Sequence, residues 1–280
     1  MSFITGLILN QSENSVSYAD TLLQTKAQED NWIIHHISDH DFIKIPAIHI
    51  GSFNLDISIT NKAFMLMIAA AFLIIGLSLA ARSNRKNKVP KGFGNFIEMI
   101  MVFLRDEVVI PSMGTAGVKY LSFFFTLFFF ILASNFLGLI PYMSTATGSI
   151  NITAGLAIIT FIMTQILGMK NNGVFGYWKG LVPPGIPVFV LPIMIVVEFL
   201  GLLTKPFALC IRLFANMTAG HVVILALIGL IFSLGYGATP ISIGFALFIY
   251  LLEILIGLLQ AYIFTMLSAL FIGMAVHQEH

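Results

Sequence analysis

Charged and amide side chains interrupt the two longest apolar stretches of the chain, residues 187–234 and 240–276. Those that we expect to do chemistry are Arg212, Asn216, His221, Glu253, Gln260 and Glu198. An arginine keeps its proton at every physiological pH, and placing it at membrane depth costs about 2.5 kcal/mol or more. Protonatable residues strung across a membrane are typical of a proton relay. These residue types therefore predict proton transfer around a permanent positive charge.

The spacing brings these residues together if the two stretches form an antiparallel hairpin that closes near residue 237. Residues at the same depth then have numbers that sum to about 474, which pairs His221 with Glu253 and places Arg212 within about half a turn of Gln260. Arg212 and Asn216 are four residues apart, so they share one helical face. The hairpin therefore predicts a polar cluster between the two helices.

Glu198 lies near His277 in this hairpin, at the opposite end of the polar chain from His221. Along the helix axis, Glu198 lies about 21 Å before Arg212, and His221 lies about 13 Å beyond it. A fixed cation in the middle of such a chain blocks direct passage of a proton. We therefore expect a second molecule to take the proton past Arg212.

Each residue also has a purely structural interpretation. Arg212 could serve only as a buried ion-pair partner of Glu253, and His221 could be a hydrogen-bonded core histidine. Glu198 and Lys205 could extend toward the membrane interface or pair locally. The two amides could only hydrogen-bond between helices, which is common in membranes.

The composition indicates an integral membrane protein of the all-α class. Of its 280 residues, 58% are hydrophobic and only 10% are charged, whereas a soluble domain has about a quarter charged residues. The net charge of +1 provides no basic face for nucleic acid. The single cysteine, Cys210, excludes a disulfide framework or a thiolate metal site, and we expect it to be a small buried hydrophobe.

Residues 1–61 form a polar segment, and residues 62–280 form a predicted membrane domain. Five spans are expected from runs of about 20 apolar residues, at residues 63–81, 118–140, 150–168, 187–234 and 240–276. A basic cluster from Arg82 to Lys91 follows the first span, so the N-terminus is expected outside and the C-terminus in the cytoplasm. The first eleven residues lack a basic region, so no cleaved signal peptide is expected. The aromatic run Phe123–Phe130 is interpreted as lipid-facing.

Two segments need separate interpretation. Residues 93–110 carry apolar side chains at helical spacing with charges between them, which favours an amphipathic helix on the cytoplasmic surface over a buried connector. The last two apolar stretches would measure about 70 Å and 55 Å as straight helices, against a hydrocarbon core of about 30 Å. We therefore expect two long and strongly tilted helices, with kinks at Pro192 and Pro206 as an option.

No recognised enzymatic motif and no cofactor site are found in the sequence. A histidine group with two aspartates near the first span suggests a metal site, but a solvated or capping role is the simpler interpretation. Its members are His35, His36, His40, His49, Asp39 and Asp41.

The residues around the arginine resemble the motif of subunit a of the F-type ATP synthase. The matching segments are Lys205-Pro206, Arg212-Leu-Phe-Ala-Asn216-Met-Thr-Ala-Gly220-His221 and Glu253-Ile-Leu-Ile-Gly-Leu-Leu-Gln260-Ala-Tyr-Ile-Phe264. Weaker matches are His35-His36, Asn135-Phe-Leu-Gly-Leu-Ile-Pro141 and Asn151-Ile-Thr153. The resemblance covers about residues 30–280.

The resemblance implies a stator subunit of a bacterial inner membrane that works against a ring of c subunits and is joined by peripheral-stalk b subunits. It implies that Arg212 faces the ring carboxylate and that Glu198 lies near the inner half-channel. The outer half-channel would be lined by Asn216, His221, Glu253 and Gln260. In some bacterial members the two channel positions are Glu and His. Here they are His221 and Glu253, which resembles the swapped arrangement of mitochondrial-type members.

The rival hypothesis is a secondary ion transporter or a channel subunit. Such proteins are built from internal repeats or paired broken helices at the bilayer midplane, and no clear repeat is found in this chain. An intramembrane hydrolase is disfavoured, because no nucleophile and base or metal-ligand set is found.

Overall fold

The computed structural model describes residues 41–43, 48–50, 53–55, 59–86, 92–140, 145–180, 189–234 and 239–277. The chain divides into two compact units. One unit, called the larger unit below, contains residues 39–220 and 250–280, and the other includes residues 221–249. Helices α8 (Leu191–Leu234) and α9 (Thr239–Val276) have residues in both units. The polar pairs described below all lie within the larger unit unless stated.

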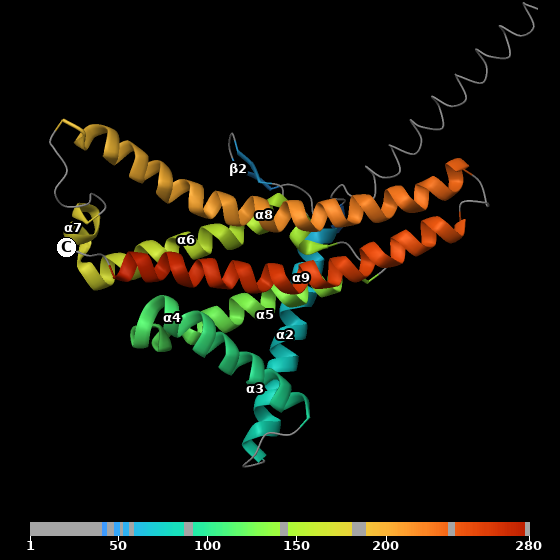
Figure 1. Ribbon diagram of the computed structural model, residues 1–280, viewed down its shortest axis with the longest axis horizontal. Coiled ribbons are helices and arrows are strands. Elements are labelled where there is room, and N and C mark those ends of the chain that lie inside the picture. Colours follow the sequence, from blue (N-terminus) through green and yellow to red (C-terminus); the bar gives the residue numbers. More distant parts are fainter. Residues whose placement is uncertain are drawn as a thin grey trace, which may run out of the picture. The chain divides into compact units, whose positions relative to one another are not determined.

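Five helical stretches among the described residues are long and apolar enough to cross a membrane, by length and composition. They are Asn61–Arg82, Phe93–Gly138, Ile150–Asn172, Leu191–Ile231 and Thr239–Val276. The corresponding long helices are α2 (Asn61–Lys86), α5 (Leu121–Gly138), α6 (Ile150–Asn172), α8 and α9 (Figure 1). The predicted helical membrane fold is confirmed, and α8 and α9 are single helices of 44 and 38 residues. Their tilt in a membrane stays a prediction.

The described residues before α2 form four short strands, which the sequence did not predict. Strand β1 (Asp41–Ile43) pairs antiparallel with β4 (Ile59–Thr60), and β2 (Ile48–Ile50) pairs antiparallel with β3 (Phe53–Leu55). Thr60 then caps the first turn of α2, because its Oγ1 accepts a hydrogen bond of 3.3 Å from the Ala63 N–H. His35, His36 and His40 lie outside the described residues.

The connection between α2 and α5 is helical but irregular. It runs through α3 (Phe93–Phe103), a π-helical segment (Leu104–Val109), α4 (Ile110–Met113) and a 3₁₀ segment (Gly114–Tyr120). Pro111 has no N–H to donate to the carbonyl four residues earlier. The Ile110 N–H bonds the Arg105 carbonyl, five residues earlier, as in a π-helix.

The predicted apolar face of residues 93–110 divides in two. Ile97, Leu104 and Val108 are buried against the protein, whereas the side chain of Phe93 is 62% exposed and that of Phe96 is 53% exposed. This segment therefore combines features of a buried connector and of an amphipathic surface helix. Its place at the cytoplasmic surface stays a prediction.

The core of the larger unit lies among α5, α6, α8 and α9. Phe124 and Ile131 of α5 are fully buried, as are Leu213 of α8 and Phe264 of α9. The interpretation of Phe123–Phe130 as lipid-facing is therefore wrong for the middle of that run, where Phe124, Leu127, Phe128 and Phe129 are all buried. Cys210 is a free, buried cysteine in the same core, as expected.

The end of α6 holds the end of α9 through side-chain amides. Asn171 Nδ2 donates to the Val276 carbonyl and Asn172 Nδ2 donates to the Ala275 carbonyl, each over 2.9 Å. These carbonyls belong to the last turn of α9 and have no partner within the helix, so the amides satisfy groups that would be costly in an apolar environment. Short α7 (Val174–Lys179) follows α6 and inserts Tyr177 beside it.

We predict that Gly168→Ala destabilises the chain by about 1–3 kcal/mol, because a Cβ at that position would lie 2.5 Å from Cε2 of the buried Tyr177 ring. Gly155→Ala is the matched control on the same helix, because a Cβ there meets nothing within 4 Å. Thermal unfolding of both variants in detergent micelles measures the difference. Equal stability of the two variants would contradict the packing of Tyr177 against α6.

Candidate functional site

Helices α8 and α9 pair antiparallel within the larger unit, in the register that the sequence predicts. Asn216 Nδ2 donates to Gln260 Oε1 over 2.8 Å, and Lys205 Nζ lies 5.6 Å from the centroid of the Phe271 ring. In both pairs the residue numbers sum to 476, against the expected value of about 474. The predicted hairpin is therefore confirmed over residues 205–216 and 260–271.

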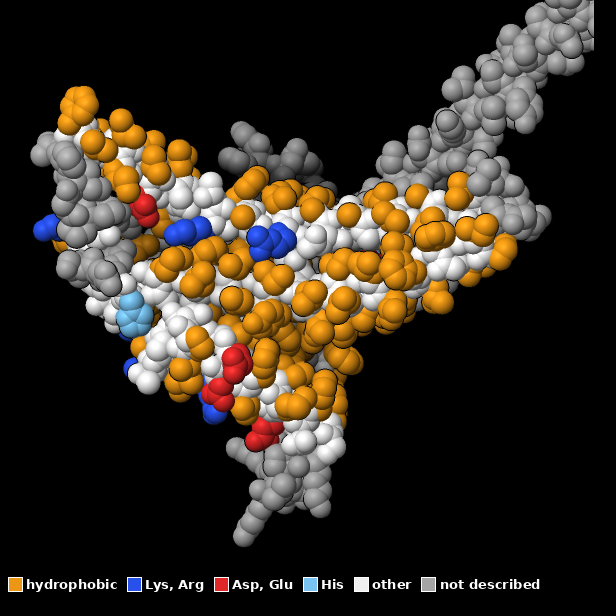
Figure 2. All heavy atoms as spheres, in the orientation of Figure 1, with side chains coloured by type: hydrophobic (Ala, Val, Ile, Leu, Met, Phe, Trp, Pro, Cys, Tyr) orange, Lys and Arg blue, Asp and Glu red, His pale blue; other side chains and the backbone are white. Residues whose placement is uncertain are grey.

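Arg212 lies on the exposed surface of α8, not between α8 and α9. It makes no ion pair and no hydrogen bond to any described side chain. The alternative in which Arg212 is only a buried partner of Glu253 is therefore wrong. Figure 2 shows acidic and basic side chains along α8 on a face that is otherwise largely apolar. Such a charge is costly in lipid, so this face requires water or a protein partner.

Glu253 and Gln260 are buried on α9, with exposed fractions of 2% and 1%. Close approach of α8 makes this possible at Gly220, because a Cβ there would lie only 2.7 Å from Glu253 Oε1. Glycine thus leaves room for the carboxylate beside the backbone of α8. His221 follows Gly220 in the chain but belongs to the other unit. Its pairing with Glu253 stays a prediction.

A buried polar network fixes α9 to α5 one turn after Glu253. Asn135 Nδ2 donates to the Gly257 carbonyl over 3.0 Å, and Thr147 Oγ1 donates to Asn135 Oδ1 over 2.8 Å. Both polar side chains are fully buried, so each needs such a partner. The position of Thr147 in a short loop without charged residues provided no sequence signal for this role.

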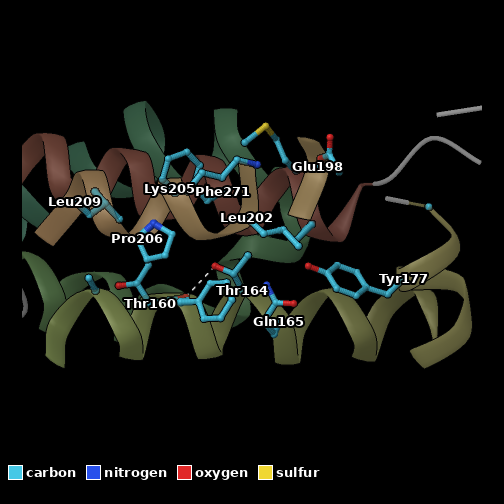
Figure 3. A pocket seen from close by; sticks show the side chains of 15 residues that line it. Thr160, Thr164, Gln165, Tyr177, Glu198, Leu202, Lys205, Pro206, Leu209 and Phe271 are labelled. Carbon is cyan, nitrogen blue, oxygen red and sulfur yellow. Dashed lines mark hydrogen bonds between the residues drawn. The ribbon is translucent and has the colours of Figure 1, made fainter. Parts of the chain in front are cut away.

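Glu198 lines a cavity of about 230 Å³ between α6, α7, α8 and the last turns of α9. Figure 3 shows Leu202 of α8 between Thr164 and Gln165 of α6 and the Tyr177 ring, with Glu198 and Lys205 on α8 at the other side of the cavity lining. Ala275 also lines the cavity, so the expected proximity of Glu198 to the end of α9 is confirmed. The sequence reasoning did not single out Gln165 or Tyr177. The only signal was a glutamine within an apolar span.

The cavity has further polar groups besides its carboxylate. Pro206 also lines the cavity and, inside α8, has no N–H to donate to the Leu202 carbonyl four residues earlier. Burial is the main cause that raises the pKa of the Tyr177 hydroxyl above its ordinary value, and the negative charge of Glu198 adds to it. The hydroxyl therefore stays protonated at neutral pH and is able to donate.

Metal binding finds no support among the residues that the structure describes, because they contain no group of three His, Cys, Asp or Glu side chains that could hold an ion. The histidines near the first span lie largely outside these residues, and the side chain of His49 in β2 is also outside the description.

Comparison with known proteins gives a consistent result. A family model described as "ATP synthase A chain" matches residues 63–273. The chain is 48% identical to "ATP synthase subunit a" of Chloroherpeton thalassium over 260 residues, which cover 88% of this chain and 77% of that protein. It is 47% identical to the protein of the same name from Myxococcus xanthus, over 85% of this chain and 78% of that protein. It is 46% identical to "ATP synthase subunit a 2" of Chlorobaculum tepidum, over 89% and 74% of the two chains.

We predict that Asn216 and Gln260 are energetically coupled. In a double-mutant cycle with Asn216→Ala and Gln260→Ala, the coupling should be about 0.6–1.7 kcal/mol, the range for hydrogen bonds between membrane helices. Unfolding in mixed micelles provides the free energies. Asn216→Ala combined with Asn172→Ala is the control, because these residues share no contact and their effects should add within about 0.5 kcal/mol. Additivity in both cycles would contradict the hydrogen bond.

Proposed function

The chain belongs to the ATP synthase A chain family, and on that premise we propose that its polar residues form two proton half-channels beside a rotating ring. The family is the non-catalytic, proton-translocating stator subunit of the F-type ATP synthase membrane sector. The chain therefore takes part in proton transport and ATP synthesis as a membrane protein. The chemistry of ATP takes place on other subunits.

The exposure of Arg212 supports this proposal most directly. A cation that cannot lose its proton stands on the outer surface of α8 with no partner among the described side chains. A carboxylate on a ring of c subunits would provide the opposite charge beside Arg212. Such a carboxylate is negative when ionised and can enter lipid only when protonated. The missing counter-charge thus belongs to a second molecule.

Entry from outside would use the cluster between α8 and α9. A proton passes through Glu253 and His221, beside the hydrogen-bonded amides Asn216 and Gln260, and neutralises the ring carboxylate. The neutral site then turns into lipid, where a charged one would be unstable. Burial of Glu253 supports this role, because it keeps bulk water and competing ions away from the carboxylate.

Release to the cytoplasm would use Glu198 and its cavity. When the ring returns, Arg212 favours the ionised form of the ring carboxylate, so its proton leaves toward Glu198. The same positive charge prevents a proton from crossing directly between the two paths. The proton-motive force biases the rotation, at about 2.3 kcal/mol per charge per 100 mV.

The assembly follows from the same proposal. Peripheral-stalk b subunits and the c ring would be the protein partners, in a bacterial inner membrane. The N-terminus would be outside and the C-terminus in the cytoplasm, since the basic cluster from Arg82 to Lys91, at the end of α2 and beyond it, favours the cytoplasmic side. Membership of the family disfavours the rival, a secondary transporter or channel subunit. Ion transport by the purified chain alone would favour the rival hypothesis. Co-purification with a ring of small two-helix subunits would support the proposal.

We predict that Arg212→Ala abolishes ATP-driven proton pumping in assembled complexes, because nothing then favours release from the ring or blocks a direct proton leak. Acidification of inverted membrane vesicles, followed with a fluorescent dye, measures pumping. Arg105→Ala is the control, because Arg105 is an exposed arginine outside α8 and α9 that pairs with the neighbouring Asp106 over 2.7 Å. Pumping by Arg212→Ala complexes at the rate of this control would refute the proposed mechanism.

We predict that His221→Ala combined with Glu253→Ala slows proton flux by about a hundredfold, the usual contribution of positioned acid–base groups. The same vesicles, together with measurement of ATP synthesis, provide the rate. Ser268→Ala is the control on α9, because its hydroxyl is buried but bonds only its own helix, at the Phe264 carbonyl. If the double variant matched the control, the outer path would not include these residues.

A further inference from the structure

Lys205 occupies a position that the two half-channels leave unexplained. It lies seven residues after Glu198 and seven before Arg212, which places it on nearly the same face of α8, about 10.5 Å from each along the axis. It is half-buried in the wall of the Glu198 cavity. No ion pair joins Lys205 to Glu198 in the described part of the chain.

Phe271 of α9 holds the ammonium in this place. Lys205 Nζ lies 5.6 Å from the ring centroid, which is the geometry of a cation–π contact. A lysine near a membrane interface ordinarily extends toward water. Here the aromatic ring keeps the charge inside, and Figure 3 shows Lys205 beside Phe271 on the same wall of the cavity as Glu198.

The cavity would otherwise suit a metal cation. Its lining includes Glu198, Thr164, Gln165 and Tyr177, whose side chains all have oxygen atoms. Oxygen donors of this kind bind hard cations such as sodium and potassium. The volume of about 230 Å³ also exceeds the space that a single water molecule needs.

We propose that Lys205 determines the ion specificity of the inner path, by keeping metal cations out of the cavity that Glu198 and Lys205 line. A metal ion retains its charge and its ligand shell beside the ammonium, so it is repelled throughout its stay. A proton forms an O–H bond with the Glu198 carboxylate, and the product is a neutral acid. The fixed charge thus acts most strongly on the ion that must be excluded. This inference rests on the proposed release of protons through Glu198.

Lys205→Gln tests the inference in inverted vesicles that contain the assembled complex. ATP-driven acidification is measured in sodium chloride and in choline chloride at equal ionic strength, so that screening is the same in both. For Lys205→Gln, sodium should lower the pumping rate about tenfold relative to choline, the order expected for a like-charge interaction over about 10.5 Å at an effective dielectric constant of about 20. The wild type and Lys205→Arg should pump equally in both salts.

Two further variants make the outcome decisive. Lys179→Gln, which removes an exposed lysine at the end of α7, should behave as the wild type. Phe271→Leu keeps the ammonium but removes the ring that holds it, so sodium should inhibit this variant by a smaller factor. Equal pumping in both salts by Lys205→Gln or by Phe271→Leu, or loss of pumping in Lys205→Gln whatever the salt, would overturn the inference. Absence of pumping in the wild type would refute the proposed function itself.

Discussion

A charge that cannot be removed has to be accommodated on the surface of a membrane helix. Arg212 cannot release its proton, and α8 leaves it exposed instead of pairing it with the nearby Glu253. Lipid cannot solvate it cheaply, so the chain is stable in this form only beside a partner or water. The arrangement of the other polar residues follows from this constraint, because each lies on one or the other side of the arginine along α8 and α9.

The register of α8 against α9 determines which polar side chains of the two helices lie together. The Asn216–Gln260 hydrogen bond sets the depth, and Gly220 allows the backbone of α8 to approach the Glu253 carboxylate. Asn135 then anchors the neighbouring turn of α9 to α5. Hydrogen bonds and small residues provide this precision because apolar burial distinguishes poorly between registers in a membrane, where lipid is as apolar as a helix face.

The polar groups on the two sides of Arg212 differ in how far water and ions can reach them. Glu253 is almost completely buried, which suits a relay that must exclude bulk water, whereas Glu198 lines a cavity with several oxygen donors. An open cavity is permissive toward any small cation. The heptad spacing of Glu198, Lys205 and Arg212 gives α8 an anion followed by two cations along one face. The proposed proton acceptor and the proposed ion barrier would therefore both lie on this helix.

The sequence alone determined the long membrane helices and the register of the last two, because apolar length and the pairing of costly charges are direct physical signals. It did not reveal that Phe124 and Phe128 are buried, nor that Gln165 and Tyr177 share a cavity with Glu198. It placed Arg212 in a polar cluster between α8 and α9, whereas the structure leaves Arg212 exposed on α8. Only the tertiary structure decided these points, since lipid-facing and protein-facing positions in a membrane are both apolar and leave no periodic contrast along the chain.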